Sequence, residues 1–171
     1  MIFFVGFVVL AGMFIPFHFS RVIADIAVDF PAALLGSDEK FARLMEEADK
    51  YVGFPYVWGG STPETSFDCS GFVSYVLTNS GLYNTGRLGA QGLYNISTPV
   101  SNPQPGDLVF FTGTYDTPGV SHVGIYVGED GDGSPVMLHC GDPIQYSKLD
   151  TSYWQSHFYA YGRLNPLRPL G

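Results

Sequence analysis

Positive charge is scarce in this 171-residue chain, which has 8 lysine and arginine residues against 16 acidic residues and a net charge of −8. The few basic residues form no cluster, and a protein that binds nucleic acid needs one to neutralise phosphates. The same scarcity argues against capture by an anionic lipid surface. Hydrophobic residues nevertheless make up 46% of the sequence, which is enough to build the core of one globular domain.

Cysteine is also rare, because only Cys69 and Cys140 occur. Two cysteines are too few to staple a small scaffold with disulfides. They are consistent with one disulfide, with two buried thiols or with one catalytic thiol, and composition does not choose among these. Zinc held by both cysteines together with His122 and His139 is a further alternative, but the spacing lacks the short cysteine pair of structural zinc sites. We therefore predict no metal and no cofactor.

A long uncharged run stands near the start of the chain, in residues 2–17, and the first charged residue is Arg21. The run is about as long as a minimal membrane span, so residues 1–20 are predicted to be a signal peptide or a membrane anchor. No basic residue precedes the run and no clear small-x-small cleavage site follows it, which weakens the signal-peptide alternative. A core helix is less favoured because no face of the run is polar. Residues 21–36 are expected to form a short amphipathic helix and a linker, and residues 166–171 a tail.

Residues 37–165 are expected to form one domain in which helices precede strands. Ser37 is placed to cap a first helix, and a second apolar stripe with helical spacing starts at Cys69 and ends before Gly81. A short helix is expected near residues 90–94. Apolar and aromatic runs between turn residues then predict strands at 108–112, 122–127, 136–139 and 158–164. This order of elements indicates an α+β domain with an antiparallel sheet.

The strand pattern predicts where the histidines point. Side chains alternate along a strand, so His122, Gly124 and Tyr126 share one face, and His139 ends the next predicted strand. The two histidines can therefore meet on one surface of the sheet. Gly124 has no side chain, and it is expected to leave room there for the helix that carries Cys69 in its first turn.

These residue types fit nucleophilic catalysis by a thiol. A thiol is a weak nucleophile until it loses its proton, and a helix N-terminus together with an imidazolium is expected to lower its pKa. His122 would take that proton and pass it to the leaving amine, while His139 would hold the ring of His122 in the useful tautomer. The backbone N–H of Cys69 is placed to help bind the oxyanion.

Five sequence blocks occur in an order that is similar to one known family. They are YVWGG (56–60), FDCSGFV (67–73), PGDLVFF (105–111), HVGIY (122–126) and MLH (137–139). In these blocks the chain resembles the NlpC-type cell-wall endopeptidases, over roughly residues 40–165. All five blocks in order are more specific than the DCSG tetrapeptide alone.

The resemblance implies a papain-like fold, with the cysteine helix N-terminal to an antiparallel β-sheet. It also implies a cysteine peptidase that hydrolyses peptidoglycan stem peptides between γ-D-glutamate and a diamino acid. By analogy Cys69 is the nucleophile, His122 the base and His139 the orienting residue. The partner is then the stem peptide, and the location is extracellular or in the envelope of a bacterium, with the protein secreted or anchored through residues 1–20.

The same resemblance implies roles for binding residues. Tyr56 would lie beside the thiol and help to bind the oxyanion, and Asp68 and Ser70 would hold the free amine end of the stem peptide. Arg87 and Gln91 resemble a polar pair that lines the groove in some relatives. Asp68 is also a candidate N-cap of the cysteine helix, and that role is compatible with substrate binding.

Two other functions stay open from the sequence. One is an amidase or acyltransferase on the same fold, which would differ only in the groove. The other is a catalytically silent wall-binding or regulatory module, although the intact set of Cys69, His122 and His139 argues against it. Cys140 is expected to be structural, and its alternative is a disulfide with Cys69 that switches the enzyme off under oxidation.

Overall fold

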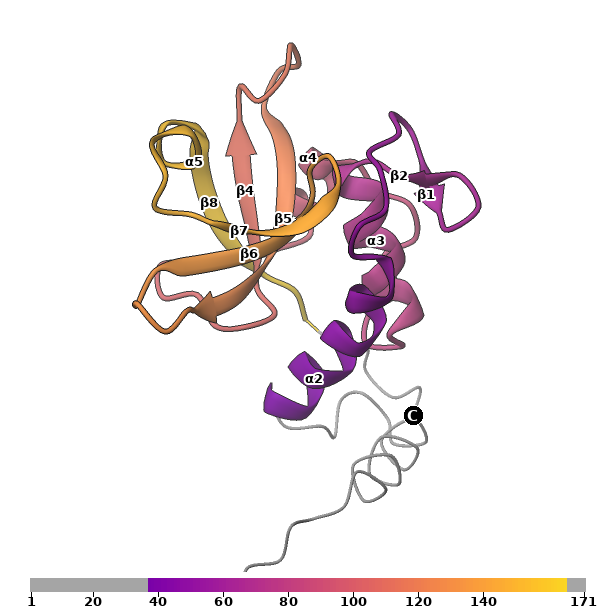
Figure 1. Cartoon of the computed structure of the whole chain (residues 1–171), viewed down its shortest axis with the longest axis horizontal. Helices are drawn as coiled ribbons and strands as arrows, with labels where there is room; N and C mark the ends of the chain where they lie inside the picture. The colour runs from indigo at the N-terminus through magenta and orange to yellow at the C-terminus, as the bar shows by residue number, and fades with distance from the viewer. Residues whose placement is uncertain (1–36, 166–171) are drawn as a thin grey trace, which may run out of the picture. The chain divides into compact units, whose positions relative to one another are not determined.

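A six-stranded antiparallel sheet organises residues 37–165, the part of the chain that this computed structural model describes (Figure 1). The signal or anchor segment, the amphipathic helix, the linker and the tail predicted for residues 1–36 and 166–171 lie outside the described residues. Within residues 37–165 no helix has the length and apolar character needed to cross a bilayer.

The helices of this region begin close to the predicted positions. They are α2 (Ser37–Ala48), the 3-10 helix η2 (Asp49–Tyr51), α3 (Cys69–Asn79), α4 (Ala90–Asn95) and α5 (Ser152–His157). The helices α2, α3 and α4 correspond to the three predicted ones. The sequence does not predict α5, because none of its six residues is buried and it therefore shows no apolar stripe.

The strands confirm the predicted α+β arrangement. They are β1 (Ser61–Thr62), β2 (Ser66–Phe67), β3 (Thr98–Val100), β4 (Leu108–Thr112), β5 (Val120–Glu129), β6 (Pro135–Cys140), β7 (Ile144–Lys148) and β8 (Phe158–Arg163). The large sheet has the order β3-β8-β4-β5-β6-β7, and β1 pairs with β2 separately. The sequence misses β3 and β7, the two edge strands, because β3 contains Pro99 and β7 buries only Ile144.

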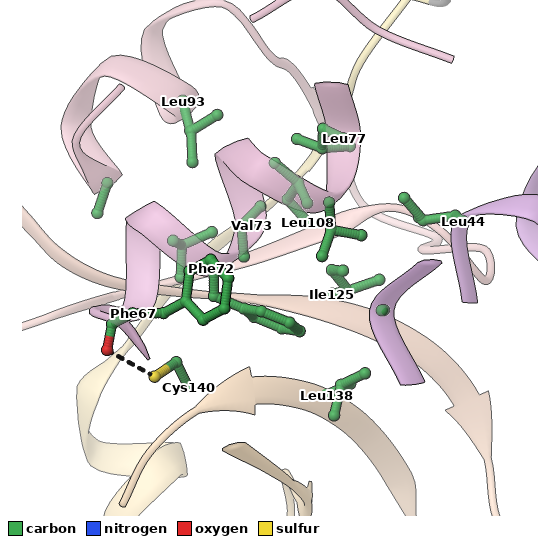
Figure 2. Packing of buried hydrophobic residues seen from close by; sticks show 14 of the residues in the cluster. Leu44, Phe67, Phe72, Val73, Leu77, Leu93, Leu108, Ile125, Leu138 and Cys140 are labelled. Carbon is green, nitrogen blue, oxygen red and sulfur yellow. Dashed lines mark hydrogen bonds between the residues drawn. The ribbon is translucent and has the colours of Figure 1, made fainter. Parts of the chain in front are cut away.

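The two faces of the large sheet carry different clusters of side chains. Figure 2 shows α3 packed against the strands, in a core that includes Val73, Leu77, Leu108, Ile125 and Leu138. The opposite face carries a smaller cluster that includes Val109, Phe111, Met137 and Leu149, with Trp154 packed against it. The predicted histidine face is the second one, because side chains alternate along β5 and β6.

Gly124 makes room for a different neighbour from the predicted one. It lies on the face away from α3, since Val123 and Ile125 belong to the core beneath the helix. A Cβ added to Gly124 would lie 2.8 Å from Sδ of Met137 and 3.1 Å from Cβ of His139, both on β6. The prediction that Gly124 makes room for the cysteine helix is therefore wrong, because side chains of the neighbouring strand occupy that space.

The first turn of α3 is held by a cap and by a close backbone contact. Asp68 caps the helix, and its Oδ1 accepts a hydrogen bond from the N–H of Gly71 at 2.6 Å. The N–H of Asp68 donates to the carbonyl of Gly60 at 2.9 Å, and a Cβ added to Gly71 would overlap that carbonyl oxygen. The loop before the helix thus packs directly on the helix backbone and fixes the position of Cys69.

We expect Gly71→Ala to destabilise the domain, although alanine is the better helix former. The added methyl group would overlap the Gly60 carbonyl, and separating the loop from the helix costs roughly 1–3 kcal/mol. Urea unfolding measures the difference. Gly92→Ala in α4 is the matched control, because its Cβ would only touch the Leu88 side chain at 3.4 Å. A Gly71→Ala variant as stable as the wild type would contradict the expected overlap.

Candidate active site

Cys69 is the first residue of α3, and its side chain is only 3% exposed. Its Sγ donates a weak hydrogen bond to the carbonyl oxygen of Ser121 on β5, at 3.9 Å. The backbone N–H groups of Ser70 and Val123 are also directed at the sulfur. The thiol therefore lies against the segment of β5 that carries His122.

The strand pairing leaves this part of β5 accessible to the helix tip. The first paired residues of β5 and β6 are Ile125 and Leu138, so the N-terminal extension of β5, from Val120 to Gly124, has no ladder partner on β6. The extension is paired with β4 along its other edge. Because the carbonyl of Ser121 lies in this extension, it can accept the thiol hydrogen bond instead of a ladder bond from β6.

The two histidines meet, as the strand pattern predicts. Nε2 of His122 lies 2.9 Å from Nδ1 of His139, with the rings at 79° to each other. Nε2 of His139 in turn lies 2.9 Å from Oγ of Ser147 on β7. Three neighbouring strands thus contribute to one row of hydrogen-bonded side chains. The sequence does not point to Ser147, because its approach to His139 depends on the register of β6 and β7.

The indole of Trp154, on α5, covers the histidine pair. It stacks on His122 with 5.3 Å between ring centroids and 26° between planes, and it meets His139 edge-on at 5.1 Å. Phe111 packs against the same indole at 4.6 Å. No sequence signal identifies Trp154, because its short helix has no periodic pattern and reaches the site only through the tertiary fold.

Burial controls the charge state of this group. It lowers the pKa of His122 well below 6.5, and the neighbouring His139 lowers that pKa further. Burial also lowers the pKa of His139 to about 4 and raises the pKa of the Cys69 thiol to about 11. The sequence-based expectation of a lowered thiol pKa is therefore wrong for the substrate-free protein, because burial outweighs the N–H groups at the helix tip. The thiol and both rings are neutral at pH 7.

A cleft of about 660 Å³ opens at the histidine pair, and tyrosine and tryptophan side chains contribute to its wall. These are Tyr56, Trp58, Tyr115, Tyr153 and Trp154. Trp58 is 72% exposed and packs edge-on against Tyr115 at 5.2 Å, so the two rings form one rim of the cleft. An extended peptide laid along the cleft would contact this rim and the histidines together.

Tyr56 lies in the cleft wall beside the thiol, as the resemblance implies. Burial and the neighbouring Cys69 both raise the pKa of the Tyr56 hydroxyl, so this group stays protonated and able to donate. The backbone N–H of Tyr56 donates to Oδ1 of Asp142 at 3.2 Å, which ties the loop before α3 to the turn after β6.

The carboxylate of Asp68 accepts four hydrogen bonds. Its Oδ1 accepts from the N–H of Gly71 and from the hydroxyl of Ser70 at 3.1 Å. Its Oδ2 accepts from the N–H of Gly59 at 3.1 Å and from the guanidinium of Arg87 at 2.7 Å. Arg87 also donates to Oγ of Ser70 at 3.0 Å. The structure thus joins these three predicted binding residues in one network that begins at the helix cap.

Gln91 lies elsewhere and is not paired with Arg87. Its Oε1 accepts from the N–H of Val120 at 2.9 Å, and its Nε2 donates to Asn95 at 2.9 Å. Gly119 is required beside it, because its φ is +77° and an added Cβ would overlap the Gln91 amide oxygen. Gln91 therefore ties α4 to the start of β5, the strand that leads to the histidine pair.

Cys140 lies on the α3 side of the sheet, as strand alternation predicts. Its thiol is fully buried and donates to the carbonyl of Phe67 at 3.2 Å (Figure 2). Both cysteines are free thiols. Among the described residues, no three His, Cys, Asp or Glu side chains gather as ligands for one metal ion, so the zinc set considered from the sequence is not assembled.

Comparison with known proteins decides the family. The NlpC/P60 family profile matches residues 53–163, a range that contains Cys69, both histidines and Ser147. The chain belongs to the NlpC/P60 family. The resemblance carried by the five sequence blocks is thereby confirmed.

The curated relatives of this NlpC/P60 chain are longer proteins. The bifunctional muramidase/DL-endopeptidase CwlT of Bacillus subtilis is 42% identical over 132 residues, which cover 75% of this chain and 38% of that protein. The gamma-DL-glutamyl hydrolase of the same organism is 38% identical over 125 residues, with coverages of 72% and 29%. The chain thus spans less than half the length of either relative.

Solved structures confirm the predicted papain-like α+β fold. An NLP/P60-family protein from Staphylococcus aureus, similar to a lipoprotein, superposes with a TM-score of 0.69 at 41% identity, covering 76% of this chain and 43% of that chain. The NlpC/p60 domain of the peptidoglycan hydrolase SagA gives a TM-score of 0.51 at 30% identity, covering 72% of this chain and 98% of that chain.

Removal of the indole of Trp154 should raise the pKa of His122 toward 6.5. Burial is the largest cause of the lowered pKa, and Trp154→Ala would admit water above the ring. An NMR titration of the His122 ring protons measures the change. Trp154→Phe keeps an aromatic ring over His122, so the His122 pKa in this variant should stay close to that of the wild type. The same His122 pKa in Trp154→Ala and in the wild type would show that the indole does not keep water from the ring.

Proposed function

We propose that this chain is a cysteine peptidase that hydrolyses peptidoglycan stem peptides between γ-D-glutamate and a diamino acid. One observation carries the proposal: the thiol at the tip of α3 lies against the strand that bears His122, and His122 is hydrogen-bonded to His139. The substrate class is supported by relatives named DL-endopeptidase, gamma-DL-glutamyl hydrolase and peptidoglycan endopeptidase.

Cys69 is the proposed nucleophile and His122 the proposed base. The thiol proton passes to Nδ1 of His122 while the sulfur bonds to the scissile carbonyl carbon and the carbonyl oxygen becomes an oxyanion. Because the thiol and the ring both start neutral, we infer that this transfer accompanies the attack. The imidazolium then protonates the leaving amine, the C–N bond breaks, and a thioester remains on Cys69.

Water completes the proposed reaction. His122 is neutral again after the amine leaves, and it takes a proton from water while the water oxygen bonds to the thioester carbon. The C–S bond then breaks, the thiolate recovers the proton from His122, and the new carboxyl group leaves. His139 is the proposed orienting residue, because its hydrogen bond to Nε2 of His122 leaves Nδ1 as the ring nitrogen that can take the thiol proton.

Two donors are proposed to bind the oxyanion. The backbone N–H of Cys69 lies at the first position of α3, where a helix has no intrahelical acceptor for it. The Tyr56 hydroxyl is the second donor, since it stays protonated beside the sulfur. Both groups would act inside a site from which the substrate and the aromatic walls exclude water, where such donors are most effective.

Asp68 and Ser70 stay the proposed site for the free amine of the stem peptide. The carboxylate of Asp68 already accepts four hydrogen bonds, one of them from Arg87, which also contacts Ser70. A substrate ammonium would therefore have to share this network with the guanidinium. Arg87 is proposed to hold the two acceptors in place, whereas the contacts of Gln91 support a role in positioning β5.

We further propose that the protein acts in the cell envelope or outside the cell. In this proposal, residues 37–165 form the catalytic domain, and residues 1–20 are an export signal or a membrane tether. The net charge of −8 argues against binding to an anionic surface. The proposed partner is therefore the peptidoglycan stem peptide.

Cys69→Ala should abolish cleavage of purified muropeptides, with a fall in kcat of roughly 10⁴-fold or more, because no other nucleophile replaces the sulfur. Mass spectrometry of the digested muropeptides measures the loss. Cys140→Ala is the matched control, since it removes the other buried thiol and should retain activity. Comparable activity in Cys69→Ala and Cys140→Ala would refute the assignment of the nucleophile.

The acid limb of the profile of kcat/KM against pH should be centred below pH 6.5. His122 acts as a base only when neutral, and burial lowers its pKa, so a lower pH is needed to protonate it than for an exposed histidine. The measurement is kcat/KM against pH for the full chain, which reports the pKa of the free enzyme. An acid limb centred above pH 6.5 would contradict a buried neutral base.

A further inference from the structure

Ser147 ends a row of hydrogen bonds that starts at the proposed base. Its Oγ lies 2.9 Å from Nε2 of His139, and Nδ1 of His139 lies 2.9 Å from Nε2 of His122. The three side chains come from β7, β6 and β5, which are adjacent in the sheet. Ser147 stands opposite Met137 in the register and His139 stands opposite Gln145, so this contact runs diagonally across the strand pair.

In this row the tautomer of each neutral imidazole determines the tautomer of the neighbouring one. Each neutral ring donates from one nitrogen and accepts at the other. A His122 ring that accepts the thiol proton at Nδ1 carries its own proton on Nε2 and donates it to Nδ1 of His139. His139 then carries its proton on Nε2 and donates to Ser147. If Ser147 donates instead, every tautomer is reversed, and a proton on Nδ1 of His122 blocks the base.

Among residues 37–165, no carboxylate is hydrogen-bonded to this row. The side chains packed around the His122 ring are Phe111 from β4, His139 from β6, Trp154 from α5 and, next to its strand segment, Cys69 from α3. Only His139 and Cys69 among them are titratable. Asp142 contributes a carboxylate to the cleft wall, and this carboxylate is hydrogen-bonded to the backbone of Tyr56. The row therefore offers a positive charge on His122 hydrogen bonds from neutral side chains, those of His139 and Ser147.

We propose that Ser147 is a positioning residue, which selects the tautomers of His139 and His122 that leave Nδ1 of His122 able to take the proton of the nucleophile. The inference rests on the proposed function of the chain as a cysteine peptidase. Ser147 acts through His139 and accepts its N–H when the imidazolium forms. Ser147 is an uncharged acceptor, and it is half-buried in the wall of the cleft.

Kinetics on a γ-D-glutamyl–diamino acid peptide test the role. Ser147→Ala should lower kcat by about 10- to 100-fold and leave KM within about twofold. The acid limb of kcat/KM should move to lower pH, because the imidazolium loses its terminal acceptor. Ser147→Thr keeps the hydroxyl on a strand that tolerates a β-branched side chain, and it should recover most of the rate. Tyr146→Phe, at a 46% exposed position on the same strand, is the control and should match the wild type.

Two kinetic outcomes would overturn the inference. One is a kcat and an acid limb in Ser147→Ala that equal those of the wild type. The other is the same loss in Ser147→Ala and Ser147→Thr, since that would assign the effect to packing and not to the hydroxyl.

The ring nitrogens report the tautomers without substrate. The chain has 4 histidines, so long-range ¹H–¹⁵N spectra of the full chain are simple to assign. We expect protonated Nε2 on both His122 and His139 in the wild type and a shift toward protonated Nδ1 in Ser147→Ala. A wild type that cleaves no peptide would refute the proposed function, whatever the spectra show. A wild type that cleaves the peptide, with unchanged tautomers in Ser147→Ala, would refute the positioning role alone.

Discussion

The contact between the first turn of α3 and β5 is the constraint on which the site depends. Asp68 caps the helix, and the backbone of Gly71 lies directly against the Gly60 carbonyl. The sulfur of Cys69 then reaches the Ser121 carbonyl, in the segment of β5 that has no ladder partner on β6. Catalytic groups must be held to roughly 0.5 Å, and side chains on flexible loops rarely meet that need. Here two regular elements and one backbone contact position the thiol.

Burial keeps the side chains of this site uncharged, which their residue types alone do not imply. The thiol, His122 and His139 are all neutral before substrate binds, because each charged form would lose its hydration. In the proposed reaction, charge therefore appears together with the oxyanion, when the donors at the helix tip can stabilise it. The aromatic cover of Trp154 and the acceptor at Ser147 fit such a site, since one excludes water and the other completes the hydrogen bonds.

Local sequence patterns were enough to predict the helix and strands at the centre of the fold. The helical stripe that starts at Cys69 predicts α3, and runs of β-branched and aromatic residues predict β4, β5, β6 and β8. The edge strands β3 and β7 and the short helix α5 escape prediction, because few of their side chains are buried and none shows a clear period. Two of the elements that complete the site, β7 and α5, are among those that local patterns do not reveal.

The sequence by itself determined the identity and order of the proposed reacting groups, the cap at Asp68 and the common sheet face of His122 and His139, since these follow from local spacing. Only the tertiary structure decided the charge of the Cys69 thiol, the meeting of Ser147 with His139 and the separation of Gln91 from Arg87. Charge depends on how much water the whole fold removes, and contacts across strands depend on register. Neither quantity is contained in the pattern of any single segment.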